Sequence, residues 1–203
     1  MSKIIAIDND IKNPYSFEVT WDLGLRCNFD CTYCPSHRHN NTSPHASLET
    51  LIKTSKFVFD YKKIMQSYMT YNRQWNIGFT GGEPILQLDS NLIKKIKSQG
   101  FKVAVETNGT LPLPKEIDWI CVSPKIKSKL IVKKGNEIKV VFPQKNIVLT
   151  EYEKLNFQHF YIQPLENKDV VLNTKKSINY VLKNPKWKLS VQTHKFLKIK
   201  FIS

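Results

Sequence analysis

The sequence contains no long apolar run. No stretch approaches the roughly 18 uninterrupted apolar residues that a membrane helix needs. The N-terminal segment MSKIIAIDND also lacks the basic-then-apolar order of a signal peptide. We therefore expect a protein without a membrane segment, located by default in the cytoplasm, where thiols stay reduced.

The chain also lacks internal repeats, low-complexity runs and long linkers. Its 203 residues, with 41% hydrophobic content, suit one globular domain with a sizeable core. We expect residues 1–203 to form a single domain.

Acidic residues are scarce: 17 Asp and Glu stand against 31 Lys and Arg, which gives a net charge of +14. The lysines are scattered through 53–63, 94–102, 125–145 and 175–200, and no ribonucleoprotein motif with aromatic stacking platforms accompanies them. A solvated surface explains most of this charge, and we expect no direct nucleic-acid partner. A basic face could instead dock an acidic electron-transfer protein.

Apolar, β-branched segments recur along the chain between turn signals and helical patterns. The helical patterns cover 47–66, 90–99 and 174–183, with Ser47 and either Asp89 or Ser90 as N-caps. The predicted strands are 16–21, 75–79, 101–105, 117–122, 137–142, 158–162 and 187–191. Strands that alternate with helices indicate an α/β fold with a parallel sheet, wound as an open sheet or a barrel.

Polar or glycine-containing segments follow six of these predicted strands. Because the carboxyl ends of parallel strands share one edge, where ligands bind, we expect the six segments to converge on one site. They are the segment DLGLR with the cysteines after it, Thr80–Pro84, Glu106–Gly109, Ser123–Lys125, Gln163–Pro164 and Gln192–Lys195.

Cys27, Cys31 and Cys34 lie within eight positions, followed by Pro35 and Ser36. A structural zinc site needs four thiolate or imidazole ligands, so these cysteines would require a nearby histidine such as His37 or His39. Alternatively, three cysteines can ligate a [4Fe–4S] cluster whose fourth iron stays open for a substrate.

The pair Gly81-Gly82 favours the cluster, because glycine lets the backbone approach a bound ligand closely. The fourth cysteine, Cys121, falls within a predicted strand, where a buried, inert thiol is expected.

The C-x₃-C-x₂-C spacing with Tyr33 before the last cysteine, together with Gly81-Gly82-Glu83-Pro84, resembles the radical S-adenosylmethionine (SAM) superfamily. The resemblance implies an incomplete β/α barrel in which Cys27, Cys31 and Cys34 hold the [4Fe–4S] cluster. It also implies that SAM binds the open iron, with Tyr33 beside the cofactor and Gly81, Gly82 and Glu83 supporting its methionine amino group.

The second half of the chain resembles the 7-carboxy-7-deazaguanine synthase family. The resemblance implies a lyase that converts 6-carboxy-5,6,7,8-tetrahydropterin to 7-carboxy-7-deazaguanine with loss of ammonia, using magnesium, in queuosine and 7-deazapurine biosynthesis. The similar segments are 106–110, 118–125, 137–144, 160–164 and 187–199.

The same resemblance implies roles for single residues and for partners. His194 would face the pterin in a C-terminal pocket segment, 187–203, and the Ser36 hydroxyl would bind Mg²⁺. A flavodoxin-like electron donor and a homodimer are also implied. The residues implied to bind SAM are Thr107, Asn108, Ser123, Lys125 and Gln163.

Three departures from the family pattern lie near the cysteines. Residues 13–24 lack a Q-G-E-G segment, Leu23 stands where an arginine is usual, and Pro35-Ser36 replace Asp-Thr. The cluster loop, 27–36, and the polar loop after it, 37–46, therefore look more like a general radical SAM opening. Two alternatives stay open: a radical SAM enzyme acting on a peptide or another pterin, and a non-enzymatic zinc or nucleic-acid-binding module.

Overall fold

The computed structural model describes residues 3–9, 16–23, 26–28, 42–45, 47–68 and 74–191. Strands and helices alternate along most of this length. In chain order they are β1 (Lys3–Asn9), β2 (Ser16–Asp22), α1 (Leu48–Tyr68), β3 (Gln74–Thr80), the 3-10 helix η2 (Pro84–Leu86), α2 (Ser90–Ser98), β4 (Phe101–Thr107), β5 (Trp119–Val122), β6 (Lys134–Phe142), α3 (Leu149–Glu153), β7 (Asn156–Pro164), α4 (Val170–Lys183) and β8 (Trp187–Leu189).

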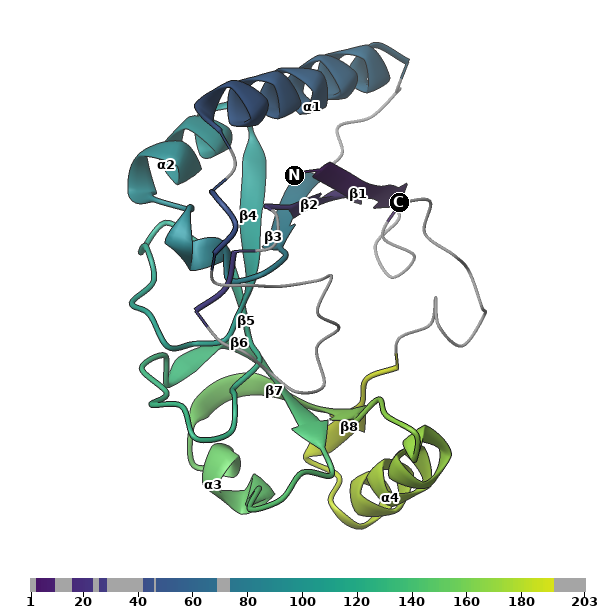
Figure 1. The fold of residues 1–203 in the computed structure, drawn as a ribbon. Coiled ribbons are helices and arrows are strands. Elements are labelled where there is room, and N and C mark those ends of the chain that lie inside the picture. The colour runs from purple at the N-terminus through teal and green to yellow at the C-terminus, as the bar shows by residue number, and fades with distance from the viewer. Residues whose placement is uncertain are drawn as a thin grey trace.

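All eight strands form one sheet, in the order of the sequence from β1 to β8. β1 pairs antiparallel with β2, and every following neighbour pairs in parallel. Parallel strands added in sequence order, joined by crossovers of one hand, curl into a barrel with the helices outside. Figure 1 shows such an arc, with β1 and β8 at its two ends. The expected α/β fold, a partial β/α barrel, is confirmed.

Each predicted strand is present, with boundaries that shift by a few residues. The helix caps also follow the sequence. The Ser47 hydroxyl accepts a hydrogen bond from the Thr50 N–H (3.1 Å), and the Asp89 carboxylate accepts one from the Leu92 N–H (2.8 Å). Gly100, at φ 76°, ends α2 in the left-handed conformation that glycine adopts without steric cost.

Some elements differ from the sequence prediction. β1 and α3 were not predicted, and α4 begins at Val170 instead of residue 174. The connections 108–118 and 123–133 contain no helix, and the sequence patterns predicted none there. Pro112 and Pro114 explain the first connection, because proline lacks the N–H that a helix interior needs.

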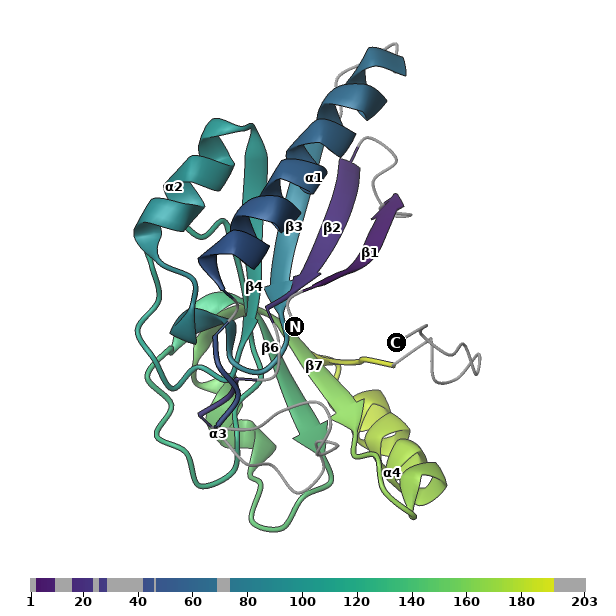
Figure 2. The same ribbon diagram turned by 45° about the horizontal axis from the view of Figure 1, so that its top comes forward.

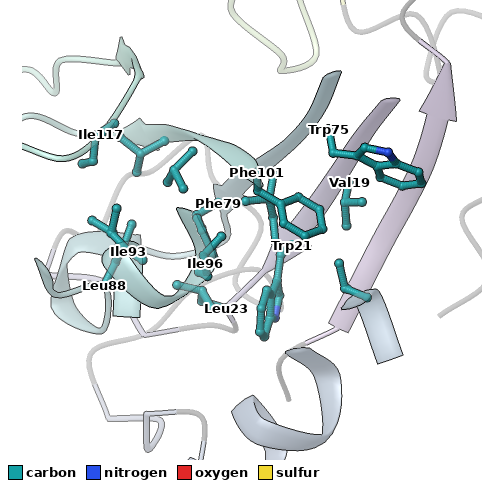
Figure 3. Packing of buried hydrophobic residues seen from close by; sticks show 14 residues of the cluster. Val19, Trp21, Leu23, Trp75, Phe79, Leu88, Ile93, Ile96, Phe101 and Ile117 are labelled. Atoms are coloured by element: carbon teal, nitrogen blue, oxygen red, sulfur yellow. The ribbon is translucent and has the colours of Figure 1, made fainter. Parts of the chain in front are cut away.

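Two apolar clusters fill the space between the sheet and its helices. Figure 3 shows the larger one, in which Trp21, Phe79 and Phe101 pack with Ile93 and Ile96 of α2. The second lies under α3 and α4, and the partly buried Leu113 and Ile120 pack against both. No helix in the described ranges is long and apolar enough to cross a membrane.

Side chains alternate between the two faces of the sheet. Along β4, Val103 and Val105 are buried in the larger cluster, whereas Lys102 and Glu106 are exposed on the opposite, inner face. Figure 2 shows α1 and α2 running over β3 and β4. The helices therefore cover one face and leave the inner face for polar groups.

Lys62 fixes α1 to the end of α2. Its side chain, 9% exposed, donates a hydrogen bond to the Gln99 carbonyl at the end of α2. Its Nζ lies 4.5 Å from the centroid of the Phe101 ring, within reach of a cation–π interaction. Burial lowers the pKa of this ammonium. The Lys62 ammonium thus takes the place of water at the C-terminus of α2, where the helix dipole favours a positive charge.

We predict that Lys62→Met lowers the free energy of unfolding by about 1 kcal/mol, because both the hydrogen bond and the ring contact are lost. Urea denaturation followed by circular dichroism measures the change. The neighbouring Lys63→Met, at an exposed position of the same helix, is the control and should leave the midpoint unchanged. Equal midpoints for the two variants would refute this role of Lys62.

Candidate functional site

The segments expected to form one site lie at one edge of the sheet, as far as the structure describes them. Thr80 and Thr107 end β3 and β4, and Gln163 is the penultimate residue of β7. Pairing continues past the strand ends, since the Leu23 N–H donates to the Thr80 carbonyl (2.9 Å) and the Ser123 N–H to the Thr107 carbonyl (2.7 Å). The polar segments thus start from a fixed edge.

Gly81 and Gly82 form a tight turn after β3. Their φ angles, 86° and 53°, lie in the left-handed region that side chains disfavour. The next residue turns back toward the cysteine segment, because the Glu83 N–H donates to the Arg26 carbonyl (2.8 Å). This bond places the glycine turn beside Cys27, whose side chain is 7% exposed.

The Glu83 carboxylate is completely buried and joins β3 to β4. One oxygen accepts hydrogen bonds from the Thr107 hydroxyl (2.7 Å) and the Ile85 N–H (3.3 Å). The other oxygen accepts one from the Asn108 N–H (2.7 Å). The side chain therefore holds together the two turns that begin at Gly81 and at Asn108.

Burial raises the pKa of Glu83 above its ordinary value. The three hydrogen bonds to its oxygens and the charge of Lys125 act in the opposite direction but do not cancel the effect of burial. The carboxylate is thus kept in place at some cost in free energy, which is typical of a group retained for a site.

Asn28, the residue after Cys27, connects the cysteine segment to the turn after β4. The Asn108 amide donates to the Asn28 side-chain oxygen (2.8 Å), and the Asn28 amide donates to the Thr110 hydroxyl (2.9 Å). The Thr110 hydroxyl in turn donates to the Asn108 oxygen (2.6 Å), which closes a ring of three side chains. Sequence reasoning missed Asn28 and Thr110; their positions inside the two motifs were the available signal.

Ser123 and Lys125 follow β5 at the same edge. The Lys125 ammonium donates to the Ser123 hydroxyl (3.4 Å) and is close enough to Glu83 to affect its pKa. A cation and a hydroxyl beside the glycine turn form a suitable environment for a carboxylate or ribose group.

A second charged group lies on the inner face of the sheet. The Lys139 ammonium of β6 donates to the Glu106 carboxylate of β4 (2.7 Å), and Glu106 directly precedes Thr107. Burial lowers the pKa of Lys139, but the acidic groups around it, Glu106 first, together outweigh burial, so the pKa is raised and the lysine stays charged. The signal in the sequence was a lysine between the apolar residues Ile138 and Val140 of a predicted strand.

Cys121 is not part of the site. Its thiol is 3% exposed within β5, and burial, reinforced by the charge of Glu106, raises its pKa. A thiol in such surroundings stays protonated and unreactive, as the sequence predicted.

Several predicted site residues lie outside the described ranges, so their roles stay predictions. They are Cys31, Tyr33, Cys34, Ser36 and His194, together with the alternative zinc ligands His37 and His39. Within the described part of the chain, no group of three or more His, Cys, Asp or Glu residues could hold a metal ion.

Comparisons with known proteins identify the family. Residues 21–121 match the model of the Radical SAM superfamily. The 7-carboxy-7-deazaguanine synthase of Nitratidesulfovibrio vulgaris is 38% identical over 176 residues, which cover 83% of this chain and 79% of that relative. The chain belongs to the 7-carboxy-7-deazaguanine synthase family of the radical SAM superfamily. The relative of the same name from Bacteroides thetaiotaomicron is 35% identical, with 86% of this chain and 84% of that relative covered.

Other comparisons agree with this family. A synthase of the same name from Burkholderia multivorans is 52% identical over 120 residues, and the match spans 57% of its length, little more than half. The crystal structure of QueE from Escherichia coli has the same fold, with a TM-score of 0.59, 20% identity and coverage of 93% of this chain and 92% of that one. Radical SAM membership implies a [4Fe–4S] cluster and SAM, which favours the iron–sulfur interpretation of the cysteines over zinc.

The described residues fit these cofactors of the radical SAM family. Cys27 supplies a thiol at the carboxyl edge of the sheet, where the Arg26–Glu83 bond holds it beside the glycine turn. Thiolates are the usual ligands of such clusters, and a turn without Cβ atoms leaves backbone groups open to a ligand.

We predict that Glu83→Gln lowers the free energy of unfolding at neutral pH by about 2 kcal/mol. An amide group replaces one acceptor oxygen, so the Asn108 N–H or the Thr107 hydroxyl loses its partner. Urea denaturation of the apo-protein measures the loss. Glu151→Gln, which removes an exposed carboxylate on α3, is the control and should change stability little.

The contribution of Glu83 to the free energy of unfolding should also depend on pH. Because the folded-state pKa is raised, the stability of the wild type relative to Glu83→Gln is greatest below the ordinary pKa of 4.5 and falls as pH rises through the folded-state pKa. A difference between the two proteins that stays constant with pH, or grows as pH rises, would contradict the raised pKa.

Proposed function

We propose that this protein converts 6-carboxy-5,6,7,8-tetrahydropterin to 7-carboxy-7-deazaguanine with loss of ammonia, the precursor step for queuosine and other 7-deazapurines. One observation carries the proposal. The Glu83 N–H donates a hydrogen bond to the Arg26 carbonyl, which joins the Cys27 segment to the Gly81–Glu83 turn at the edge of a partial barrel. Relatives named 7-carboxy-7-deazaguanine synthase support this product.

In this proposal Cys27, Cys31 and Cys34 hold the cluster. Held by these thiolates, the cluster would supply an electron for the reductive cleavage of SAM, the chemistry from which 5′-deoxyadenosine arises when the substrate gives up a hydrogen atom. Glu83 acts as a positioning residue, since its carboxylate is fully engaged by groups of the protein. It holds the Gly81-Gly82 backbone where the methionine amino group would bind.

The other residues at the edge orient SAM. Ser123 and Lys125 approach its methionine carboxylate or ribose, and Gln163 approaches the ribose. Thr107 and Asn108 line the pocket, and the contacts of both with Glu83 fix their positions. A rigid set of donors is needed because orientation at the reacting centre accounts for much of catalysis.

The substrate is proposed to lie over the inner face of the sheet. The Glu106–Lys139 pair presents one carboxylate and one ammonium there, beside the end of β4. A pterin carries a carboxylate and ring N–H and C=O groups, which such polar side chains can recognise. His194 would contact the pterin and Ser36 would bind Mg²⁺.

Further partners complete the proposal. A flavodoxin-like protein donates the electron, and the active form is a homodimer. The location is the cytoplasm, because a reducing compartment preserves cluster thiolates.

The experiment that tests the function is anaerobic reconstitution with iron and sulfide, followed by SAM, a reductant, Mg²⁺ and 6-carboxytetrahydropterin. We expect 7-carboxy-7-deazaguanine by mass spectrometry, and neither this product nor 5′-deoxyadenosine from Cys27→Ala, Cys31→Ala or Cys34→Ala. Persistent 5′-deoxyadenosine formation in those variants would contradict the cluster assignment. Close to one zinc per chain, without labile sulfide, in the anaerobically prepared protein would contradict both radical SAM hypotheses.

Variants of the substrate site should behave differently from the cysteine variants. We predict that Ser36→Ala and His194→Ala assemble the cluster normally but lower kcat/KM for the pterin about 10- to 100-fold, the value of one or two strong hydrogen bonds. Ser36→Thr, which keeps the hydroxyl, should retain activity and its dependence on Mg²⁺. Full activity of Ser36→Ala or His194→Ala would exclude that residue from the pocket.

Two alternative substrates, a peptide and a different pterin, follow from the departures near the cysteines. Leu23, at the position where the family usually has arginine, is 1% exposed and belongs to the larger apolar cluster. The nearby Arg26 donates to the Ser43 carbonyl (3.2 Å). A radical SAM enzyme for a peptide or a different pterin would explain this change. SAM cleavage without the deazaguanine product would favour it.

A further inference from the structure

The connection between β5 and β6 concentrates positive charge. Between Asp118 and Glu137 the chain carries five lysines and no acidic residue. Lys127 and Lys129 are exposed, and Ile131, in the same connection, is 48% exposed. We define the lysine loop as residues 125–131.

Among the residues that the structure describes, no carboxylate forms an ion pair with the exposed Lys127 or Lys129. The ion pairs found among the described residues use lysines from other elements: Lys56, Lys94, Lys97, Lys139 and Lys154. The loop therefore presents the charges of Lys127 and Lys129, together with the apolar side chain of Ile131, to the solvent.

The lysine loop is held firmly against the site. The N–H groups of Ile131 and Val132 both donate to the Gly109 carbonyl (2.9 and 3.0 Å), and the Ser128 hydroxyl donates to the Lys125 carbonyl (2.7 Å). A Cβ added to Gly109 would lie 2.7 Å from the Leu130 side chain, so the contact is close. A fixed loop loses little conformational entropy when a partner binds.

The same contacts bring the lysine loop near the cysteine segment. Gly109 lies between Asn108 and Thr110, and both of these hydrogen-bond to Asn28. Asn28 is the residue next to Cys27. Two steps of direct hydrogen bonding thus connect the charged loop to the residue beside the first cluster ligand.

We propose that Lys127, Lys129 and Ile131 form the docking surface for the protein that reduces the cluster, an acidic electron-transfer protein. The inference rests on the proposed function, in which the cluster needs an external electron. Opposite charges would steer the donor to a surface close to the cluster, and Ile131 would provide an apolar centre for the contact.

The composition of the loop favours a protein partner over a nucleic acid. Residues 123–134 contain no aromatic side chain on which a base could stack. They also contain no arginine, the residue best suited to bidentate phosphate contacts. A small charged patch with one exposed aliphatic side chain suits a transient protein complex.

The double variant Lys127→Glu/Lys129→Glu tests the proposal. Its matched control is Lys175→Glu/Lys176→Glu, which changes the net charge by the same amount at two exposed positions of α4. The rate of 5′-deoxyadenosine formation is measured with two reductants, an acidic flavodoxin and dithionite. At low ionic strength the loop variant should lose about tenfold of the flavodoxin-driven rate, whereas the dithionite-driven rate should equal that of the wild type.

Salt dependence and direct binding complete the test. The flavodoxin-driven rate of the wild type should fall as KCl is added, and that of the loop variant should change little. Calorimetric titration with flavodoxin measures docking without turnover, so it remains informative even if the proposed substrate is wrong. Formation of 7-carboxy-7-deazaguanine by the wild type with dithionite as the reductant tests the proposed function separately.

Three outcomes would overturn the proposal. The loop and α4 variants could lose the flavodoxin-driven rate equally, which would assign the effect to total charge. The loop variant could lose the dithionite-driven rate as well, which would make the loop a support of the site. It could also lose tRNA binding while keeping the flavodoxin-driven rate, which would make the loop a nucleic-acid surface.

Discussion

The buried carboxylate of Glu83 is the interaction on which the site depends. The carboxylate accepts hydrogen bonds from the side chain of Thr107 and the backbone of Asn108. The backbone N–H of Glu83 donates to the Arg26 carbonyl. Three segments distant in sequence, the ends of β3 and β4 and the start of the cysteine loop, are fixed to one another in this way. A charge buried without such partners would destabilise the fold by several kcal/mol, so the network and the carboxylate require each other.

The hydrogen bonds around Glu83 belong to a larger set that fixes several loops to the edge of the sheet. The glycine turn, the turn after β4 and the lysine loop are connected through backbone hydrogen bonds to the same edge of the sheet. The departures from the family pattern are the missing Q-G-E-G segment in 13–24, Leu23 and Pro35-Ser36, and of these positions the structure describes residues 16–23. Leu23 is packed in the apolar cluster, so its side chain belongs to the core, and its N–H still donates to the Thr80 carbonyl at the SAM-binding edge.

The sequence predicted the parts that follow from periodicity. Apolar, β-branched segments predicted the strands, and the side chains of β3 and β4 indeed alternate between buried and more exposed positions. The parallel order places the polar ends of these strands together. Contacts between residues distant in sequence could not be predicted in this way. The binding of Lys62 to the end of α2, the ring of Asn28, Asn108 and Thr110, and the Glu106–Lys139 pair all depend on how elements pack. β1 was missed because an antiparallel edge strand breaks the βα repeat.

A double-mutant cycle on SAM affinity tests the central claim most directly. SAM binding to the reconstituted cluster form is measured by calorimetry for the wild type, Glu83→Gln, Thr107→Val and the double variant. If the Glu83–Thr107 contact positions the SAM-binding edge, each single change weakens binding, and the double change weakens it by clearly less than the sum, with a coupling of about 1 kcal/mol. Unchanged affinity in the single variants, or strictly additive losses, would show that the site does not depend on this contact.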